Sequence, residues 1–237
     1  MKLFLLICVG ALLSIPLAVI AQNKLDTDSA QKAYQKVITQ RSNKIVLGLN
    51  ISDSIVFYKV QNAMILQYSH LSALHDSLNG LVKTIKTTTN ITKEQIAASI
   101  LQIENTRTEK LQVLHQQFIA SVASVLSASQ VAQLKDGMTY NILPITQKAY
   151  EDMLPNLTTE QKAQINTYLT EAREFAMDAE SSEKKHAWFG KYKGKINNYL
   201  SAAGIDMKKA GQEWEERRKA KKNNLVIINK YTTQLFK

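Results

Sequence analysis

Lysines and aromatic residues alternate in the segment from Lys185 to Tyr199, which also holds Gly190 and Gly194. Flat aromatic faces suit sugar rings, and ammonium groups pair with carboxylate or sulfate groups. Because glycine adopts backbone angles closed to other residues, we expect a turn that presents these side chains. The segment therefore predicts a binding surface and indicates no reaction. The candidate binding residues are Trp188, Lys191, Tyr192, Lys193, Lys195 and Tyr199.

The same aromatic side chains have a second interpretation, as core anchors that hold the C-terminal helices on the rest of the protein. We assign this structural role to Phe189 and Trp214. Both interpretations stay open for Trp188 and Tyr192. The lysines are the better candidates for exposure, although each contact that they make would be weakened by salt.

Histidine and carboxylate chemistry has little support in this sequence. The chain has four histidines, and none occurs in a metal-binding spacing such as His-Glu-x-x-His. His75 and Asp76 are weaker site candidates, and the simpler interpretation is that they are ordinary polar positions beside an apolar stripe. We therefore expect no metal, no cofactor and no catalytic residues. A polysaccharide lyase or hydrolase is a third possibility, favoured only if a cleft brings His75–Asp76 close to the turn at Lys191–Lys195.

The N-terminus has the pattern of a secretory signal peptide. Lys2 precedes an apolar run that ends at Ala21, where we expect cleavage, so that residues 1–21 form the signal and the mature chain begins at Gln22. An uncleaved membrane anchor is the alternative. The single cysteine, Cys8, would leave with the signal, which excludes disulfides, thiolate metal sites and cysteine nucleophiles. We expect an exported protein, periplasmic or extracellular, with no membrane span after signal removal.

The net charge of +10 is concentrated near the C-terminus. Residues 22–183 hold 15 Lys/Arg against 16 Asp/Glu, whereas residues 184–237 hold 14 against 4. This asymmetry points to an anionic partner, and outside the cytoplasm we expect acidic polysaccharide, lipid headgroups or an acidic protein before nucleic acid. The alternative is a lysine-rich solvated surface.

Helical periodicity predicts an all-α, multi-helix bundle. Apolar stripes from Phe57 to Ile85 and from Ile96 to Val125 step by three and four residues, which predicts a long central antiparallel helix hairpin. We expect residues 22–237 to form a single helical domain, with a near-neutral bundle part at 22–155 and C-terminal helices carrying the basic segment at 156–237. The expected core residues of the hairpin are Val60, Leu71, Leu74, Leu78, Ile100, Ile103, Leu114, Phe118 and Val122.

Three capping boxes mark helix starts, each with a Ser or Thr followed three residues later by Gln: Thr92 with Gln95, Ser127 with Gln130, and Thr158 with Gln161. The other expected elements are helices at 29–47, 158–183, 196–203 and 206–222, and an extended strap formed by the β-prone run at 225–228.

Two family resemblances follow from these motifs. The three capping boxes with their preceding apolar residue are similar to the Leu-Thr-x-x-Gln repeats of small helical periplasmic chaperones and envelope-stress adaptors, which protect unfolding clients without ATP. Helix capping alone also explains these boxes.

The second resemblance covers most of the mature chain and is to the exported bacterial family catalogued as domain of unknown function 3826. That family is suspected of binding sugar, often beside polysaccharide-degrading systems, and it implies no catalytic residues. Here Asn50-Ile51-Ser52 stands where the family leads us to expect a Leu-Thr pair. The segments that carry the resemblance are 41–46, 49–53, 71–76, 185–204 and 213–214.

Together these features predict an exported, non-enzymatic binding or accessory protein whose ligand is a saccharide, anionic or neutral, and most plausibly one with acidic groups. The alternative is a periplasmic chaperone-like or envelope-stress protein with a protein client. A compact aromatic-lysine pocket would favour the first function, and a concave, basic, apolar-lined surface the second.

Overall fold

A computed structural model describes the backbone of residues 17–235 and the side chains of residues 29–222, so residues 1–16 of the expected signal peptide lie outside the described part. The described chain is all-helical, as predicted, and contains no strand. Its helices are α1 (Leu17–Leu47), α2 (Ser54–Thr87), α3 (Lys93–Ala123), α4 (Ala128–Met138), α5 (Ile142–Met153), α6 (Thr159–Met177), α7 (Ser182–Ala202) and α8 (Met207–Leu235).

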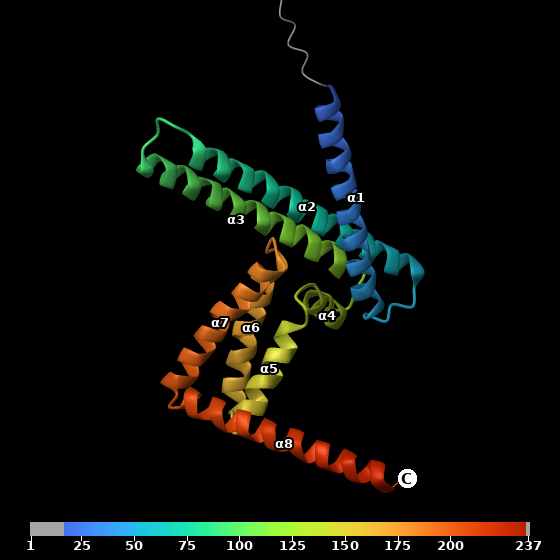
Figure 1. Cartoon of the computed structure of the whole chain (residues 1–237), viewed down its shortest axis with the longest axis vertical. Helices are drawn as coiled ribbons and strands as arrows, with labels where there is room; N and C mark the ends of the chain where they lie inside the picture. The colour runs from blue at the N-terminus through green and yellow to red at the C-terminus, as the bar shows by residue number, and fades with distance from the viewer. Residues whose placement is uncertain (1–16, 236–237) are drawn as a thin grey trace, which may run out of the picture.

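The predicted antiparallel hairpin is present as α2 and α3, and α1 packs across it (Figure 1). The hairpin and α8 lie at opposite ends of the molecule, with α5, α6 and α7 between them (Figure 1). The turn between α6 and α7 meets the side of the hairpin. This arrangement brings two long helices of the N-terminal half against a corner of the C-terminal half.

All three predicted capping boxes are confirmed at the starts of α3, α4 and α6. In each, the hydroxyl oxygen of Thr92, Ser127 or Thr158 accepts the backbone N–H three residues on, and the glutamine side chain accepts the N–H of the cap residue. Each box satisfies two backbone donors that a helix start otherwise leaves free, which stabilises the helix by about 1 kcal/mol.

The apolar interior consists of two clusters. One joins α1–α4 and includes Val60, Phe118 and Val122, and it also takes Met177 from the end of α6. The other joins α5–α7 with the start of α8 around Phe189 and Tyr192. The expectation of one shared hairpin core was therefore only partly right. Leu71 and Leu78 are buried outside both clusters, and Leu74, Ile100, Ile103 and Leu114 are only half-buried.

The half-burial of Ile100 and Ile103 has a simple cause. The end of the hairpin farthest from α1 consists of α2 and α3 alone (Figure 1). A stripe on either helix therefore has one neighbour there instead of several, and part of each side chain stays in contact with solvent.

The predicted turn at the aromatic-lysine segment was wrong, because α7 is a continuous helix through Gly190 and Gly194. Each interior glycine costs about 1 kcal/mol relative to alanine. The burial of one face of α7 against α6 stabilises the helix by more than that cost. The chain turns instead at Gly204, whose φ of 85° lies in the left-handed region that favours glycine. The buried face consists of Lys185, Phe189, Tyr192, Ile196 and Leu200.

The end of α6 differs from the prediction, whereas the start of α8 agrees with it. Helix α6 ends at Met177 and not near Glu183, because the ammonium group of Lys185 donates hydrogen bonds to the carbonyls of Ala176 and Met177 and so satisfies this helix end. Asp206 caps α8 as expected, with its Oδ1 accepting the Lys209 N–H at 2.9 Å.

Helix α8 continues to Leu235, so the extended strap predicted at 225–228 is helical. Adding a residue to an existing helix is far easier than starting one, which outweighs the β preference of this run. Among the described residues, no helix combines the length and apolar character needed to span a membrane.

Candidate functional site

A groove of about 920 Å³ lies where the α6–α7 corner meets α3 and α2. It is the place where side chains from four helices converge, and it contains most of the charged groups that join the two halves of the molecule. The residues that line it are His75, Asn79, Glu104, Arg107, Thr108, Leu111, Gln112, His115, Gln116, Glu174, Phe175, Asp178, Ala179, Glu180, Lys184, Ala187, Trp188 and Lys191.

An aromatic platform, formed by Phe175 of α6 and Trp188 of α7, lies on one wall of the groove. Their rings are stacked, with centroids 4.5 Å apart and planes inclined by 15°. Phe175 is 46% exposed and Trp188 is half-buried, so part of the pair is in contact with solvent in the groove. Exposed stacked aromatics in a concave site offer a flat apolar surface to a ligand.

Lysines stand on both sides of this platform along α7. Positions 184, 187, 188 and 191 follow the spacing that places residues on one helix face. The Lys191 ammonium nitrogen lies 4.9 Å from the centroid of the Trp188 ring, a cation–π distance. Lys184 is exposed and lies 3.5 Å from a carboxylate oxygen of Glu180.

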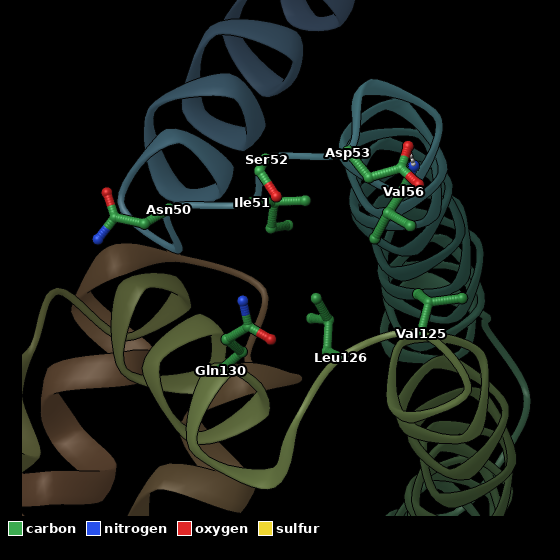
Figure 2. Close-up of a pocket in the computed structure, with 8 residues that line it drawn as sticks. All are labelled: Asn50, Ile51, Ser52, Asp53, Val56, Val125, Leu126 and Gln130. Atoms are coloured by element: carbon green, nitrogen blue, oxygen red, sulfur yellow. Dashed lines mark hydrogen bonds between the residues drawn. The ribbon is translucent and has the colours of Figure 1, made fainter.

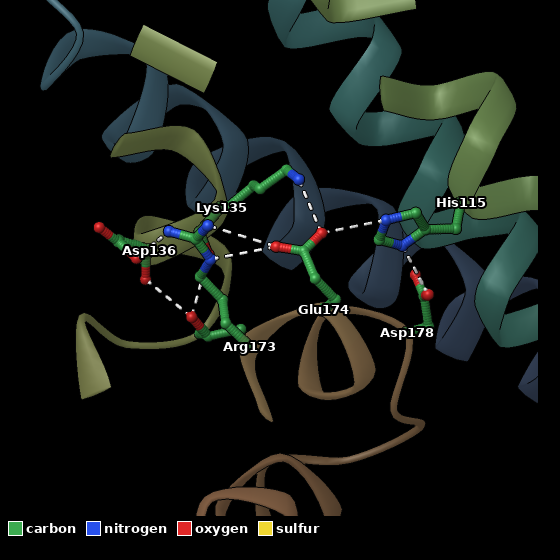
Figure 3. A network of polar contacts seen from close by, with 7 residues as sticks. His115, Lys135, Asp136, Arg173, Glu174 and Asp178 are labelled. Atoms are coloured by element: carbon green, nitrogen blue, oxygen red, sulfur yellow. Dashed lines mark hydrogen bonds and ion pairs between the residues drawn. The ribbon is translucent and has the colours of Figure 1, made fainter. Parts of the chain in front are cut away.

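His115 of α3 connects the opposite wall to α6 (Figure 3). Its Nδ1 lies 2.8 Å from Asp178 Oδ2 and its Nε2 lies 3.2 Å from Glu174 Oε2. A carboxylate can only accept, so both ring nitrogens donate and the ring is an imidazolium. The hydrogen bonds to Asp178 and then Glu174 raise the pKa of His115 to about 9, against the opposing effect of burial.

Glu174 is the centre of this network, between His115 on one side and Lys135 and Arg173 on the other (Figure 3). Burial favours a raised pKa for this carboxyl, but hydrogen bonds from His115 and Lys135, with the charges of Lys135 and Arg173, outweigh it and lower the pKa to about 2. Arg173 also pairs with Asp136 at 2.8 Å. The network therefore fastens α3, α4 and α6 together beside the groove.

His75 has both ring nitrogens occupied by protein groups. Its Nε2 donates to the Asp178 carbonyl at 2.8 Å, which leaves Nδ1 to accept from Arg107 Nη1 at 3.1 Å. Asp76 is not part of the groove, because its carboxylate accepts from Ser72 on the exposed face of α2. The groove does bring His75 to the same site as Lys191, but it separates His75 from Asp76 and leaves this histidine no free nitrogen for proton transfer.

The sequence profile of a family described as "Protein of unknown function (DUF3826)" matches residues 35–220, which include every residue of the groove. The chain belongs to the DUF3826 family. This confirms the family resemblance seen in the sequence. No curated protein matches this DUF3826 chain.

The candidate binding residues of this DUF3826 protein separate onto different faces of α7. Trp188 and Lys191 line the groove, as the binding hypothesis requires. Tyr192 is 2% exposed and belongs to the core beside Phe189, which was correctly assigned a structural role. A helix turns through about 100° per residue, so consecutive side chains of the segment cannot share one surface.

The other candidates lie outside the groove. Lys193 is exposed on a different face of α7, and Lys195 lies over the Tyr192 ring at 4.1 Å and 3.9 Å from Glu171. Tyr199 is half-buried against Tyr168, with ring centroids 6.3 Å apart.

Trp214, expected in the core, is half-buried outside both clusters and carries Arg218 at 4.9 Å from its ring centroid. Trp214 lies on the charged helix α8, whose described apolar contacts with the α5–α7 cluster are at Met207 and Ala210, and this explains the difference.

A second hollow, of about 230 Å³, lies between the loop after α1 and the start of α4 (Figure 2). Two of its polar side chains, Asp53 and Gln130, have structural roles. Asp53 Oδ1 accepts two backbone N–H groups at the start of α2, and Gln130 donates to the Leu49 carbonyl at 3.2 Å. The loop holds Asn50 at a φ of 52°. This hollow belongs to the turn between α1 and α2, and the DUF3826 groove is the stronger candidate site.

Proposed function

We propose that this DUF3826 protein is an exported, non-enzymatic saccharide-binding protein, and that the groove between α3 and the α6–α7 corner is its site. The observation that carries the proposal is the stacked Phe175–Trp188 platform, which faces an open groove with 46% of Phe175 exposed. A protein leaves a large aromatic surface in contact with water at some cost, and a ligand with a flat apolar face removes that cost.

The polar groups near the platform support the same ligand class. Gln112 and Gln116 stand one helical turn apart on α3, both exposed, and neither amide is hydrogen-bonded to another side chain among residues 29–222. Amide groups both donate and accept, so they match the hydroxyls of a sugar. The groove thus combines a stacking surface with adaptable hydrogen-bonding groups on the facing wall.

The ionisable groups of the groove support binding over catalysis. His75 and His115 use both of their ring nitrogens for protein contacts, and Glu174 accepts from three side chains. A general acid or base needs a free lone pair or a transferable proton directed at the substrate. These groups instead hold the walls of the groove in place.

The mixed charge of the groove favours saccharide over an unfolded protein client. Glu104, Asp178 and Glu180 share it with the basic side chains, so it lacks the uniformly basic character expected of a chaperone surface. A client-binding surface also needs an extended apolar patch, whereas the apolar part here is mainly one aromatic pair with neighbouring Leu111.

Trp188→Ala tests the proposal directly. A glycan array identifies a ligand for the wild-type protein, and titration calorimetry then compares the variants. We expect Trp188→Ala and Phe175→Ala each to weaken saccharide binding roughly tenfold, since truncation of a central aromatic anchor typically costs more than 1 kcal/mol.

Tyr58→Ala is the matched control, because Tyr58 is an exposed aromatic residue, 61% exposed, on α2 outside the groove. It should bind like the wild type. Equal affinity of the wild type and Trp188→Ala for every glycan bound, with unchanged thermal melts, would contradict the proposed site.

A further inference from the structure

We propose that the groove selects anionic oligosaccharides, and that Lys184 and Lys191 bind two carboxylate or sulfate groups of one ligand on either side of the Phe175–Trp188 platform. This inference rests on the proposed function and specifies its ligand class. It is carried by three features of the groove, which are the register of the two lysines, the pairing of the surrounding carboxylates, and the distance between the lysines.

The spacing of Lys184 and Lys191 along α7 places both lysines on the wall that carries the platform. Lys184 and Lys191 are seven residues apart on α7, and Trp188 lies between them on the same helix face. Both ammonium groups are exposed, and that of Lys191 lies over the Trp188 ring. A saccharide that lies along this face of α7 would therefore meet one ammonium group at each end of the platform.

Three of the four carboxylates that line the groove are paired with protein cations other than these two lysines. Glu104 pairs with Arg107 at 3.0 Å, and Asp178 pairs with His115 at 2.8 Å. Glu174 accepts from Lys135, Arg173 and His115.

The two lysines are less committed. Among the described residues Lys191 has no carboxylate within ion-pair distance, and Lys184 has only Glu180 at 3.5 Å. Glu180 also accepts from Asn79 at 3.0 Å. Two ammonium groups can therefore contact an anionic ligand, that of Lys191 directly and that of Lys184 in exchange for its contact with Glu180.

The distance between the lysines sets the length of the ligand. At 1.5 Å per residue, seven positions on a helix separate the two Cα atoms by about 10.5 Å along the axis. This exceeds the width of one pyranose ring, so a monosaccharide can contact only one of the lysines. Two anionic groups on different units of an oligosaccharide can contact both, and the second contact becomes intramolecular once the first has formed.

Lysine is a point charge without the planar fork of arginine, so this site would accept either carboxylate or sulfate. The ligand could therefore be a uronate-containing or a sulfated saccharide. The two sources share the same recognition chemistry, and the experiment includes an arm for each.

The test measures the affinity of the mature protein by titration calorimetry at low salt for hexagalacturonate, its methyl ester, galacturonic acid and a sulfated heparin hexasaccharide. The proteins are wild type, Lys184→Gln, Lys191→Gln and the double variant. Lys193→Gln is the matched control, because it removes an exposed lysine of the same helix outside the groove.

We expect each single variant to bind one or both anionic hexasaccharides two- to fivefold more weakly, the double variant to bind about tenfold more weakly, and Lys193→Gln to bind like the wild type. The uncharged methyl ester should bind all five proteins equally. The wild type should bind the hexamer more tightly than the monomer and lose this advantage as salt rises. Dependence on the lysines for only one of the two hexasaccharides supports the inference and identifies the anionic group.

Equal affinity of wild type and the double variant for both anionic hexasaccharides would overturn this inference. If Trp188→Ala still weakened binding of the methyl ester, saccharide binding at the platform would stand without anion selection. Absence of binding to every saccharide by the wild type would overturn the inference and the proposed function together.

Discussion

His115 on α3 and Asp178 at the end of α6 are joined by a 2.8 Å hydrogen bond between Nδ1 and Oδ2, across 63 positions of sequence. The same imidazolium reaches Glu174 at 3.2 Å, so one histidine ties the hairpin to the C-terminal half through two carboxylates. The stability of this junction therefore depends on the protonation of one ring, and its pH dependence can be measured.

We predict that stability falls as pH rises from about 6.5 to about 9. The pKa of His115 is about 9 in the folded protein, raised by hydrogen bonds to Asp178 and Glu174, and about 6.5 when unfolded. Its contribution is complete below the lower value and is lost as pH passes the upper one, an effect of at most about 3 kcal/mol. Thermal melts across this range check it. His115→Gln should melt lower at pH 6 and show a flatter profile, and an NMR titration of His115 with a midpoint near 6.5 would contradict the prediction.

Lys185→Met should destabilise the protein by about 1 to 3 kcal/mol, because the Ala176 and Met177 carbonyls at the end of α6 would lose their donor in a buried site. Lys184→Met changes the neighbouring exposed lysine and should stay within about 0.5 kcal/mol of the wild type. Chemical denaturation measures both. A Lys185→Met protein as stable as its control would mean that water or the backbone replaces this donor.

The correction from turn to helix in α7 predicts that Gly190→Ala and Gly194→Ala each stabilise the protein, by about 0.5 to 1 kcal/mol. Neither glycine has an atom within 4 Å of an added Cβ, and both lie inside a helix. Gly204→Ala is the contrasting variant, because its φ of 85° is strained for alanine, and it should destabilise. Lower melting temperatures for Gly190→Ala and Gly194→Ala would contradict the continuous helix and support the turn predicted from sequence.

The loss of stability on truncating a core side chain should increase with the burial of that side chain. Phe118→Ala should cost about 3 to 5 kcal/mol because Phe118 is buried in the α1–α4 cluster. Leu114→Ala, one turn earlier on the same helix, should cost less than about 2 kcal/mol because Leu114 is half-buried. Denaturation midpoints compare the two, and a larger loss for Leu114→Ala would show that Leu114 contributes more packing than its partial exposure indicates.

Export remains a prediction of the sequence. N-terminal sequencing of the protein from fractionated cells should begin at or near Gln22, since the apolar run ends at Ala21 before polar residues. In the full-length chain this bond lies within α1. A full-length product in the cytoplasmic fraction would contradict the prediction.

The features that could be predicted from sequence are those that depend on neighbours along the chain. The capping boxes at Thr92, Ser127 and Thr158 act over three residues, and apolar stripes of constant period require a hairpin wherever a short loop joins them. The continuous helix at Gly190 and Gly194 was missed because its stability comes from packing against α6, which local propensity does not contain.

The groove could be predicted only in part. Trp188 and Lys191 were recognised because they lie within one unusual segment, whereas Phe175 is one of two widely spaced aromatic residues in the mostly polar helix α6. His75 contacts the Asp178 carbonyl across 103 positions, a separation at which one sequence carries no spacing signal. The division of the aromatic-lysine segment into buried and exposed faces likewise became visible only once its helix was known.

The existence of two apolar clusters has a consequence for how the protein opens. Among residues 29–222 the two clusters have no core residue in common, and Met177 at the end of α6 is the point where one half enters the core of the other. The polar contacts across the seam gather around His115 and Glu174, so we expect the two halves to separate at a free energy below that of global unfolding. The groove lies on that seam. A ligand that contacts both walls would bind only the form in which the two halves are together. It would therefore raise the free energy needed to separate them, and a tighter ligand would raise it more.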